Sequence, residues 1–192
     1  MKVPKIEPVV IHMVVKDNSY RSAKSLTIPS GTTHIQEKAF EGCYKLREVK
    51  LSEGLKHIGK EAFRHSGIQK ITIPDSVTQI EKGAFEGCEK LKTATLSQGL
   101  VKILDNTFDH SGIEKIVIPD SVEYIGKYAF AWCENLCEIE LSRSLFEKYN
   151  ADYGWLYQDI FYGIKKETIT ARVRESFAGG QTVSEETIKL YV

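Results

Sequence analysis

The sequence predicts a β-dominated α/β solenoid of about six rungs, with parallel strands on one face and a short helical segment near the C-terminus. Five phenylalanines recur at intervals of 23, 22, 23 and 22 residues, each with an isoleucine five positions before it. Between them, apolar residues follow the pattern L-x-x-L-x-L, whose last two positions alternate at the period of a strand. A unit this short cannot bury its apolar residues alone, so the units must stack. The repeated phenylalanines are Phe40, Phe63, Phe85, Phe108 and Phe130.

The composition narrows the classes of partner. The 192 residues include 26 Lys and Arg and 26 Asp and Glu, so the formal net charge is zero and no broad field attracts nucleic acid or anionic lipid. The longest apolar run, residues 9–15, is far shorter than the roughly 20 residues that span a bilayer. We therefore expect a protein or peptide partner, no nucleic acid and no membrane insertion. The sequence makes no prediction of oligomeric state.

Each rung is predicted to hold one strand and a return path of about 17 residues, estimated from the repeat length. Pro29, Pro74 and Pro119 directly follow three of the strands, where a residue without an N–H ends a ladder. The loops after the phenylalanines alternate between a Gly-Cys form and a His-Ser-Gly form that is one residue shorter. The alternation therefore lies in one loop, and the strands keep a constant register.

The unit I-x-x-x-A-F-x-G-C-x-x-L-x-x-I-x-I-P resembles the BspA-like, or Treponema-type, class of leucine-rich repeats, over residues 25 to about 145. The resemblance implies a leucine-rich-repeat solenoid of a kind found largely in bacterial surface proteins. It also implies adhesion to host or matrix proteins and a cell-surface or secreted location. The stripe of short polar side chains on the strands and the lack of any catalytic motif predict a non-enzymatic, protein-binding module. Other leucine-rich repeats carry Asn or Cys at a turn position where this chain has only Gly or Ser, so the turn amides must bond to carbonyls, water or Ser hydroxyls. That position holds Gly31, Gly54, Ser76, Gly99, Ser121 and Ser144.

The cysteines predict no disulfide framework. Cys43, Cys88 and Cys133 recur every 45 residues, which is two rungs. At about 4.8 Å per rung, their Cα atoms are about 9 to 10 Å apart, beyond the roughly 7 Å that a disulfide bridges. We expect them to be small buried side chains, and Cys137 to be an exposed thiol. Unpaired cysteines and the lack of a convincing signal peptide predict a cytoplasmic location on the sequence alone.

Two histidines invite a catalytic interpretation. His65 and His110 occupy equivalent loop positions, each followed by Ser-Gly, and residues 109–111 contain Asp, His and Ser. Neighbours in sequence on a loop point in different directions, so this run is not a catalytic triad. We expect Gly67 and Gly112 to supply backbone freedom in these turns. The sequence thus predicts no catalytic residue, no cofactor and no metal site; a hydrolase is the alternative that the histidines leave open.

The outward side of the strands is the candidate binding face. Repeat proteins hold extended partners on such a concave surface. Alternatively, the face only sets the strand register and keeps an exposed sheet hydrated. Its central stripe is Thr27, Lys50, Thr72, Thr95, Val117 and Glu140, and the neighbouring stripe is Glu48, Lys70, Thr93, Lys115 and Glu138. In the second stripe, opposite charges fall on adjacent rungs in its first and last pairs. A cytoplasmic regulatory or assembly scaffold is the alternative function.

The ends of the repeat predict the domain organisation. Residues 1–22 form an N-terminal cap with a strand at 9–15, residues 23–145 form the solenoid, and residues 146–192 form an aromatic C-terminal cap. Within the last part, Ile169, Val173 and Phe177 at spacing four predict a helix over 166–177. The final residues fit either a short helix or a strand. The aromatic cluster closes the core or, alternatively, forms a ligand pocket; it comprises Tyr149, Tyr153, Trp155, Leu156, Tyr157, Ile160, Phe161 and Tyr162.

Overall fold

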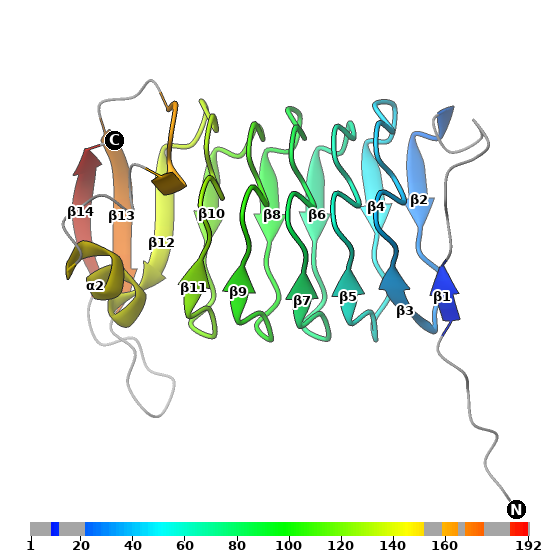
Figure 1. Ribbon diagram of the computed structural model, residues 1–192, viewed down its shortest axis with the longest axis horizontal. Coiled ribbons are helices and arrows are strands. Elements are labelled where there is room, and N and C mark those ends of the chain that lie inside the picture. The colour runs from blue at the N-terminus through cyan, green and yellow to red at the C-terminus, as the bar shows by residue number, and fades with distance from the viewer. Residues whose placement is uncertain (1–8, 12–21, 152–158, 165–167, 175–184, 192) are drawn as a thin grey trace, which may run out of the picture.

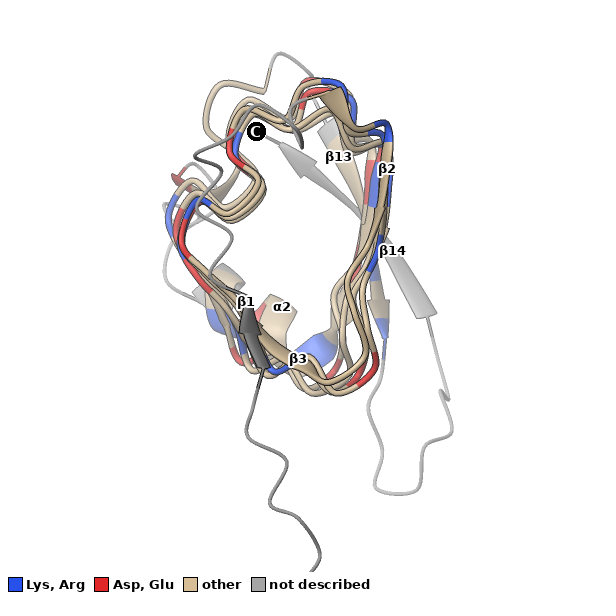
Figure 2. Cartoon of the chain, turned by 90° about the vertical axis from the view of Figure 1, so that its right-hand side faces the viewer, with Lys and Arg blue, Asp and Glu red and all other residues tan. Residues whose placement is uncertain are grey.

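The chain winds into coils that stand side by side in one row (Figure 1). The structure is a computed structural model that describes residues 9–11, 22–151, 159–164, 168–174 and 185–191. Seen along the row, the coils superpose into one ring, with β2 and β3 on different flanks (Figure 2). The predicted β-dominated solenoid with parallel strands on one face is confirmed.

One flank of the ring is an eight-stranded sheet in the order β14-β13-β12-β10-β8-β6-β4-β2. Its pairs are parallel from β2 to β13, as the one-directional winding of the coils requires, and β14 pairs antiparallel to β13. The strands are β2 (Ser25–Thr27), β4 (Glu48–Lys50), β6 (Lys70–Thr72), β8 (Thr93–Thr95), β10 (Lys115–Val117), β12 (Glu138–Ser142), β13 (Thr168–Arg174) and β14 (Glu185–Tyr191).

The return path carries strands of its own, so the prediction of one strand per rung was incomplete. These strands form a sheet of order β1-β3-β5-β7 and a separate β11-β9 pair. The isoleucine five positions before each phenylalanine ends a return strand. β1 pairs with β3, so it covers the first return strand, whereas residues 12–15 of the predicted N-terminal strand lie outside the described residues. The strands are β1 (Val9–Ile11), β3 (Thr32–Ile35), β5 (His57–Ile58), β7 (Gln79–Ile80), β9 (Lys102–Ile103) and β11 (Tyr124–Ile125).

The five repeated phenylalanines form one continuous stack through the core. Their ring centroids are 5.1 to 5.5 Å apart and their planes are within 17° of parallel. All five are fully buried. Phe161 extends the stack, with its ring centroid 6.0 Å from that of Phe130. Phe161, Ile160 and Tyr149 are buried at this end of the core, while Tyr153, Trp155, Leu156 and Tyr157 lie outside the described residues.

Each loop around a phenylalanine contains two residues in the left-handed conformation, two positions before and two positions after the ring. Their φ angles lie between 53° and 68°, and seven of the ten are not glycine. Residues other than glycine rarely adopt this backbone conformation, so hydrogen bonds to the neighbouring coil must stabilise it. The Phe63 N–H donates to the Ala84 carbonyl at 2.8 Å, and the Phe85 N–H donates to the Thr107 carbonyl at 2.9 Å. The residues are Lys38, Gly42, Glu61, His65, Gly83, Gly87, Asn106, His110, Tyr128 and Trp132.

Serine hydroxyls and carbonyls satisfy the turns that lack an asparagine ladder. The Ser76 hydroxyl donates to the Leu55 carbonyl at 2.8 Å and accepts from the Gly54 N–H at 3.0 Å. The Ser121 hydroxyl makes the equivalent bond to the Leu100 carbonyl at 2.8 Å. The expectation drawn from the Gly and Ser residues at this position is therefore confirmed at these two rungs.

The helix predicted over 166–177 was wrong. Residues 168–174 form the strand β13, which continues the sheet beside β12, and the helix α2 (Arg143–Ala151) lies earlier in the chain. Ile169, Ala171 and Val173 are fully buried, which is the period-2 pattern of a strand. The spacing of four residues between Ile169 and Val173 fits the period of a helix as well as that of a strand. The buried Ala171 midway between them fits only the strand. The final segment, left open between helix and strand, is the strand β14.

Candidate functional site

The eleven predicted face residues lie where the sequence placed them, in two stripes across β2, β4, β6, β8, β10 and β12. In each three-residue strand from β4 to β10 the outer two side chains are exposed and the middle one is buried. The ladder sets members of a stripe directly opposite one another, as with Lys70 and Thr93 or Thr72 and Thr95. We call this surface the strand face. The protein-binding role assigned to it stays a prediction.

At the C-terminal end, the charges of the strand face are paired with one another. Lys115 Nζ lies 2.9 Å from one carboxylate oxygen of Glu138, and Arg172 Nε lies 3.1 Å from the other. The hydrogen bond from Lys115 and the charge of Arg172 hold the pKa of Glu138 below its usual value. Lys92 and Glu114, just before β8 and β10, form another pair at 3.0 Å.

Arg174 on β13 forms further ion pairs at this end of the strand face. Its guanidinium lies 3.2 Å from Glu140 and 3.0 Å from Asp120, and it donates to the Ile118 carbonyl. Arg172 and Arg174 were missed at the level of sequence because their segment was read as a helix. The strict alternation of residues 168–174 is the signal that could have found them.

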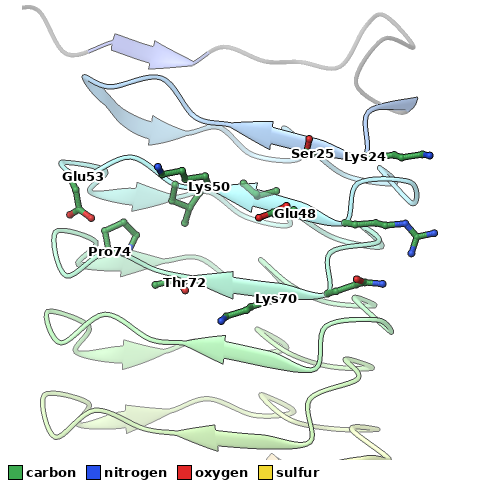
Figure 3. Close-up of a pocket in the computed structure, with 12 residues that line it drawn as sticks. Lys24, Ser25, Glu48, Lys50, Glu53, Lys70, Thr72 and Pro74 are labelled. Atoms are coloured by element: carbon green, nitrogen blue, oxygen red, sulfur yellow. The ribbon is translucent and has the colours of Figure 1, made fainter.

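At the N-terminal end, the strand face contains a hollow of about 760 Å³. Lys50 and Glu48 lie on one strand and Lys70 lies on the next, with Lys24 before β2 (Figure 3). Arg47 also lines the hollow, and Glu53, Ser25, Thr72 and Pro74 are among its other lining residues. None of its four cations and two anions forms an ion pair with a residue that the structure describes. We call the hollow with these lining residues the basic hollow.

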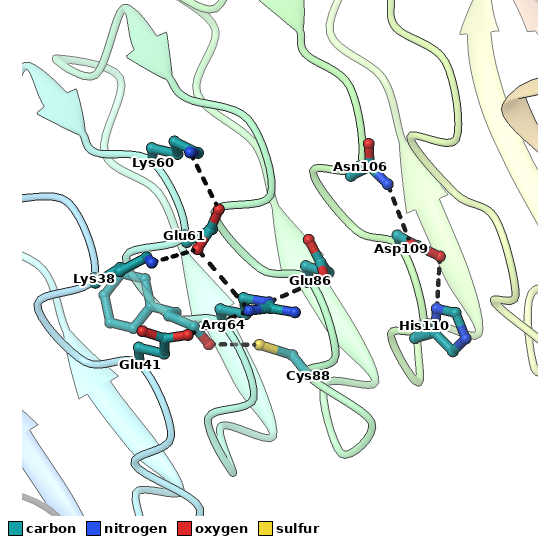
Figure 4. A network of polar contacts seen from close by, with 11 residues as sticks. Lys38, Glu41, Lys60, Glu61, Arg64, Glu86, Cys88, Asn106, Asp109 and His110 are labelled. Atoms are coloured by element: carbon teal, nitrogen blue, oxygen red, sulfur yellow. Dashed lines mark hydrogen bonds and ion pairs between the residues drawn. The ribbon is translucent and has the colours of Figure 1, made fainter.

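The loops carry a second cluster of charges, centred on Arg64 (Figure 4). The Arg64 guanidinium contacts Glu86 at 3.0 Å and Glu41 at 3.3 Å, which belong to the rungs on either side. Burial alone would raise the pKa of Glu61, but Lys38 and Lys60 hold it below its usual value. Because every charge in the cluster has partners on neighbouring rungs, the cluster holds the loops of adjacent coils together.

The residues 109–111 do not form a catalytic triad. His110 Nδ1 lies 2.7 Å from an oxygen of Asp109 (Figure 4), but the hydroxyl of Ser111 lies 3.2 Å from the buried sulfur of Cys133 instead. Ser111 is only 3% exposed. A serine nucleophile must contact its base and be open to substrate, whereas the hydroxyl of Ser111 is buried and contacts Cys133.

The role predicted for Gly67 and Gly112 needs correction. Neither has a positive φ; the left-handed residues in these loops are the histidines two positions earlier. A Cβ on Gly67 would overlap the backbone carbonyl of Tyr44, and one on Gly112 would overlap that of Glu89. These glycines are needed because neighbouring coils approach closely, and not for backbone freedom.

The buried cysteines are hydrogen-bonded parts of the loop core. The Cys88 thiol donates to the Phe63 carbonyl at 3.0 Å (Figure 4), and the Cys133 thiol donates to the Phe108 carbonyl at the same distance. Burial raises the pKa of Cys88 to about 12 and that of Cys133 to about 11. Because the thiolate is the reactive form, both are inert in the folded protein.

We expect iodoacetamide at pH 8 to modify one thiol of the native protein, Cys137, which is exposed. Cys43, Cys88 and Cys133 are buried and should react only after unfolding. Intact-mass spectrometry would show one added group under native conditions and four in denaturant. Alkylation of the three buried thiols at the rate of Cys137 would contradict the burial described above.

Within the described residues, no group of three or more His, Cys, Asp and Glu side chains is arranged to hold a metal ion. The described helices also include none with the length and apolar character needed to cross a bilayer.

Comparison with known proteins gives a consistent picture. A family model described as a BspA type leucine rich repeat region, in 6 copies, matches residues 17–137 and 101–153. The structure is similar to that of PcpA, a pneumococcal vaccine antigen, with 30% identity and a TM-score of 0.59 over 64% of this chain and 31% of that one. No functionally curated protein matches the sequence significantly.

Two further solved structures are similar. The leucine-rich repeat protein TpLRR of T. pallidum is 28% identical, with a TM-score of 0.60 over 62% of this chain and 59% of that one. A leucine-rich repeat protein from Eubacterium ventriosum is 27% identical, with a TM-score of 0.57 over 64% and 32% of the respective chains. In all three comparisons the matched part is less than two thirds of the other protein's length.

Proposed function

The chain belongs to the BspA-type leucine-rich repeat family, and from this premise we propose that it is a protein-binding module without catalytic activity, whose partner docks on the strand face. The observation that carries the proposal is the alternation of buried and exposed side chains within each strand. The middle residue is buried in the core, while the two outer residues form continuous exposed stripes on a fixed backbone. A fixed array of side chains suits recognition of an extended surface and provides no enclosed site for chemistry.

The test is to replace Lys50, Thr72 and Thr95 together by glutamate. Each is exposed, so the fold should survive while the shape and charge of the central stripe change. We expect the triple variant to lose at least tenfold in the recovery of partners that the wild-type protein captures by pull-down. Circular dichroism would verify that the variant is folded.

A matched control exists on the opposite flank. It consists of one lysine and two threonines, Thr33, Lys56 and Thr78, which lie in or next to three successive return strands. The Lys56 N–H donates to the Thr33 carbonyl, and the Thr78 N–H donates to the Lys56 carbonyl. Their replacement by glutamate introduces the same charges away from the strand face. We expect this control to keep the partners. If the strand-face variant also retains every partner, the strand face is not the binding surface.

The location of the protein decides which partners it meets. Likeness to a pneumococcal vaccine antigen supports the proposal that the protein is displayed at the cell surface. Adhesion to host or matrix proteins is the role that we propose for it there. The alternative, a cytoplasmic regulatory or assembly scaffold, is supported by four cysteines that form no disulfide. Protease treatment of intact cells separates these roles, because only a surface protein is digested while a cytosolic marker remains whole.

A further inference from the structure

We propose that the basic hollow binds an extended acidic peptide segment of the partner; this rests on the proposed protein-binding function and specifies the chemistry of the partner. The hollow is the part of the strand face where charges remain without ion pairs to described residues. An acidic segment would supply the counter-charges that the protein itself does not.

The contrast between the two ends of the strand face carries this inference. At the C-terminal end four cations are matched by four anions, and each has a partner within 3.2 Å: Lys92, Lys115, Arg172 and Arg174 against Glu114, Glu138, Glu140 and Asp120. In the basic hollow four cations face two anions, and no ion pair among described residues joins them. Glu48 and Lys70 are directly opposite in the ladder yet do not pair. The excess of two positive charges is therefore available to a ligand.

The spacing of the cations suits an extended chain. Lys24, Arg47 and Lys70 lie on three successive rungs, so the first and last are separated by about 9.6 Å along the row. In an extended segment of the polyproline II type, residues three apart lie on the same side of the chain and are about 9 Å apart. Two acidic residues at this interval would reach the outer rungs at once, with Lys50 beside them on the middle rung.

The hollow is less suited to nucleic acid. The described residues that line it include no aromatic side chain on which a base could stack, and Glu48 and Glu53 would oppose a continuous line of phosphates. The exposed aliphatic stems of Lys50 and Lys70 and the methyl group of Thr72 provide contact for side-chain carbons of a peptide. A peptide with separated acidic residues avoids the two glutamates, whereas a uniform polyanion does not.

The probe is a fluorescein-labelled ten-residue peptide with glutamate at every third position and threonine between, and the comparisons are the same peptide with glutamine in place of glutamate and a ten-nucleotide single-stranded DNA. Fluorescence anisotropy with the full chain at low salt measures affinity. Removing two exposed charges from the contact by Lys50→Gln and Lys70→Gln should weaken acidic-peptide binding roughly fivefold to tenfold. The matched double variant Lys82→Gln and Lys127→Gln removes the same charge from two exposed ion pairs away from the strand face and should change the affinity less than twofold.

Three results would overturn the inference: no binding of the acidic peptide by the wild-type protein, equal losses in the two double variants, or tighter binding of the DNA than of the acidic peptide. The first two mean that the hollow does not select acidic peptides, and the third assigns it to nucleic acid. The pull-down with the Lys50, Thr72 and Thr95 variant is independent of this probe. Partners lost in that variant while the acidic peptide fails to bind would leave the protein-binding function standing without the acidic specificity.

Discussion

Replacing Phe85 by alanine is expected to lower the free energy of unfolding by about 3 to 5 kcal/mol, the range for a buried phenylalanine. Phe85 is fully buried in the middle of the stack, with its ring centroid 5.4 Å from those of both Phe63 and Phe108. Alanine would leave a cavity between two coils whose association is the source of stability in a solenoid. Urea unfolding followed by circular dichroism measures the loss.

The position in the stack provides a control. Among the described residues, Phe40 stacks on one phenylalanine and Phe85 stacks on two. In a solenoid each coil interacts with its neighbours, so Phe40→Ala should cost about 1 kcal/mol less than Phe85→Ala. A cost below about 1.5 kcal/mol for Phe85→Ala, under the usual range for this change, would show that the stack is not a principal stabilising element.

The repeated part of the fold could be predicted because its period is visible in the residues themselves. An isoleucine, a phenylalanine and an alternating strand at a fixed interval allow one arrangement in which all of them are buried. The return strands were not predicted because each has one recurring apolar residue, the isoleucine at its end, whereas the strands of the strand face belong to a pattern with apolar residues two positions apart. A single recurring apolar residue cannot reveal an alternation.

The C-terminal part could not be predicted in the same way, because the repeat resumes there after an insertion. Phe161 follows Phe130 by 31 residues instead of 22 or 23, yet it stacks on Phe130, and Gly163 repeats the left-handed residue two positions after the ring. Coil geometry thus persists where the regular spacing has ended. The helix prediction failed because it used only the spacing of four between apolar residues. It did not take into account that residues 168–174 continue the repeat and add a strand to the sheet.

The candidate face shows a second limit of sequence-based prediction. The two stripes follow from strand alternation, and the structure places all eleven residues on them. The sequence does not distinguish Glu48 and Lys70 from Lys115 and Glu138, which are both opposite charges on adjacent rungs. Only the second pair forms an ion pair, at 2.9 Å, and Arg172 joins it from a strand that the sequence did not reveal. Pairing depends on rotamers and on neighbours across the sheet, which a linear pattern does not contain.

Close approach of the coils gives the last prediction: Gly112→Ala should lower the free energy of unfolding by about 3 kcal/mol. The new Cβ would overlap the Glu89 carbonyl, which is backbone and cannot rotate away as a side chain would. The coils would have to separate where the Gly112 N–H donates to the Cys88 carbonyl at 3.2 Å, weakening that bond. Urea unfolding of the variant beside the wild-type protein measures the cost.

Gly42→Ala is the matched control, because Gly42 has a φ of 68° and a Cβ added there would meet no atom within 4 Å. Alanine there incurs only the strain of the left-handed conformation, about 1 kcal/mol. His65 already adopts this conformation at the equivalent loop position, with a φ of 53°. If contact between coils determines where glycine is required, Gly112→Ala must cost at least twice as much as Gly42→Ala. The reverse order would show that backbone conformation, and not the distance between coils, determines where these loops need glycine.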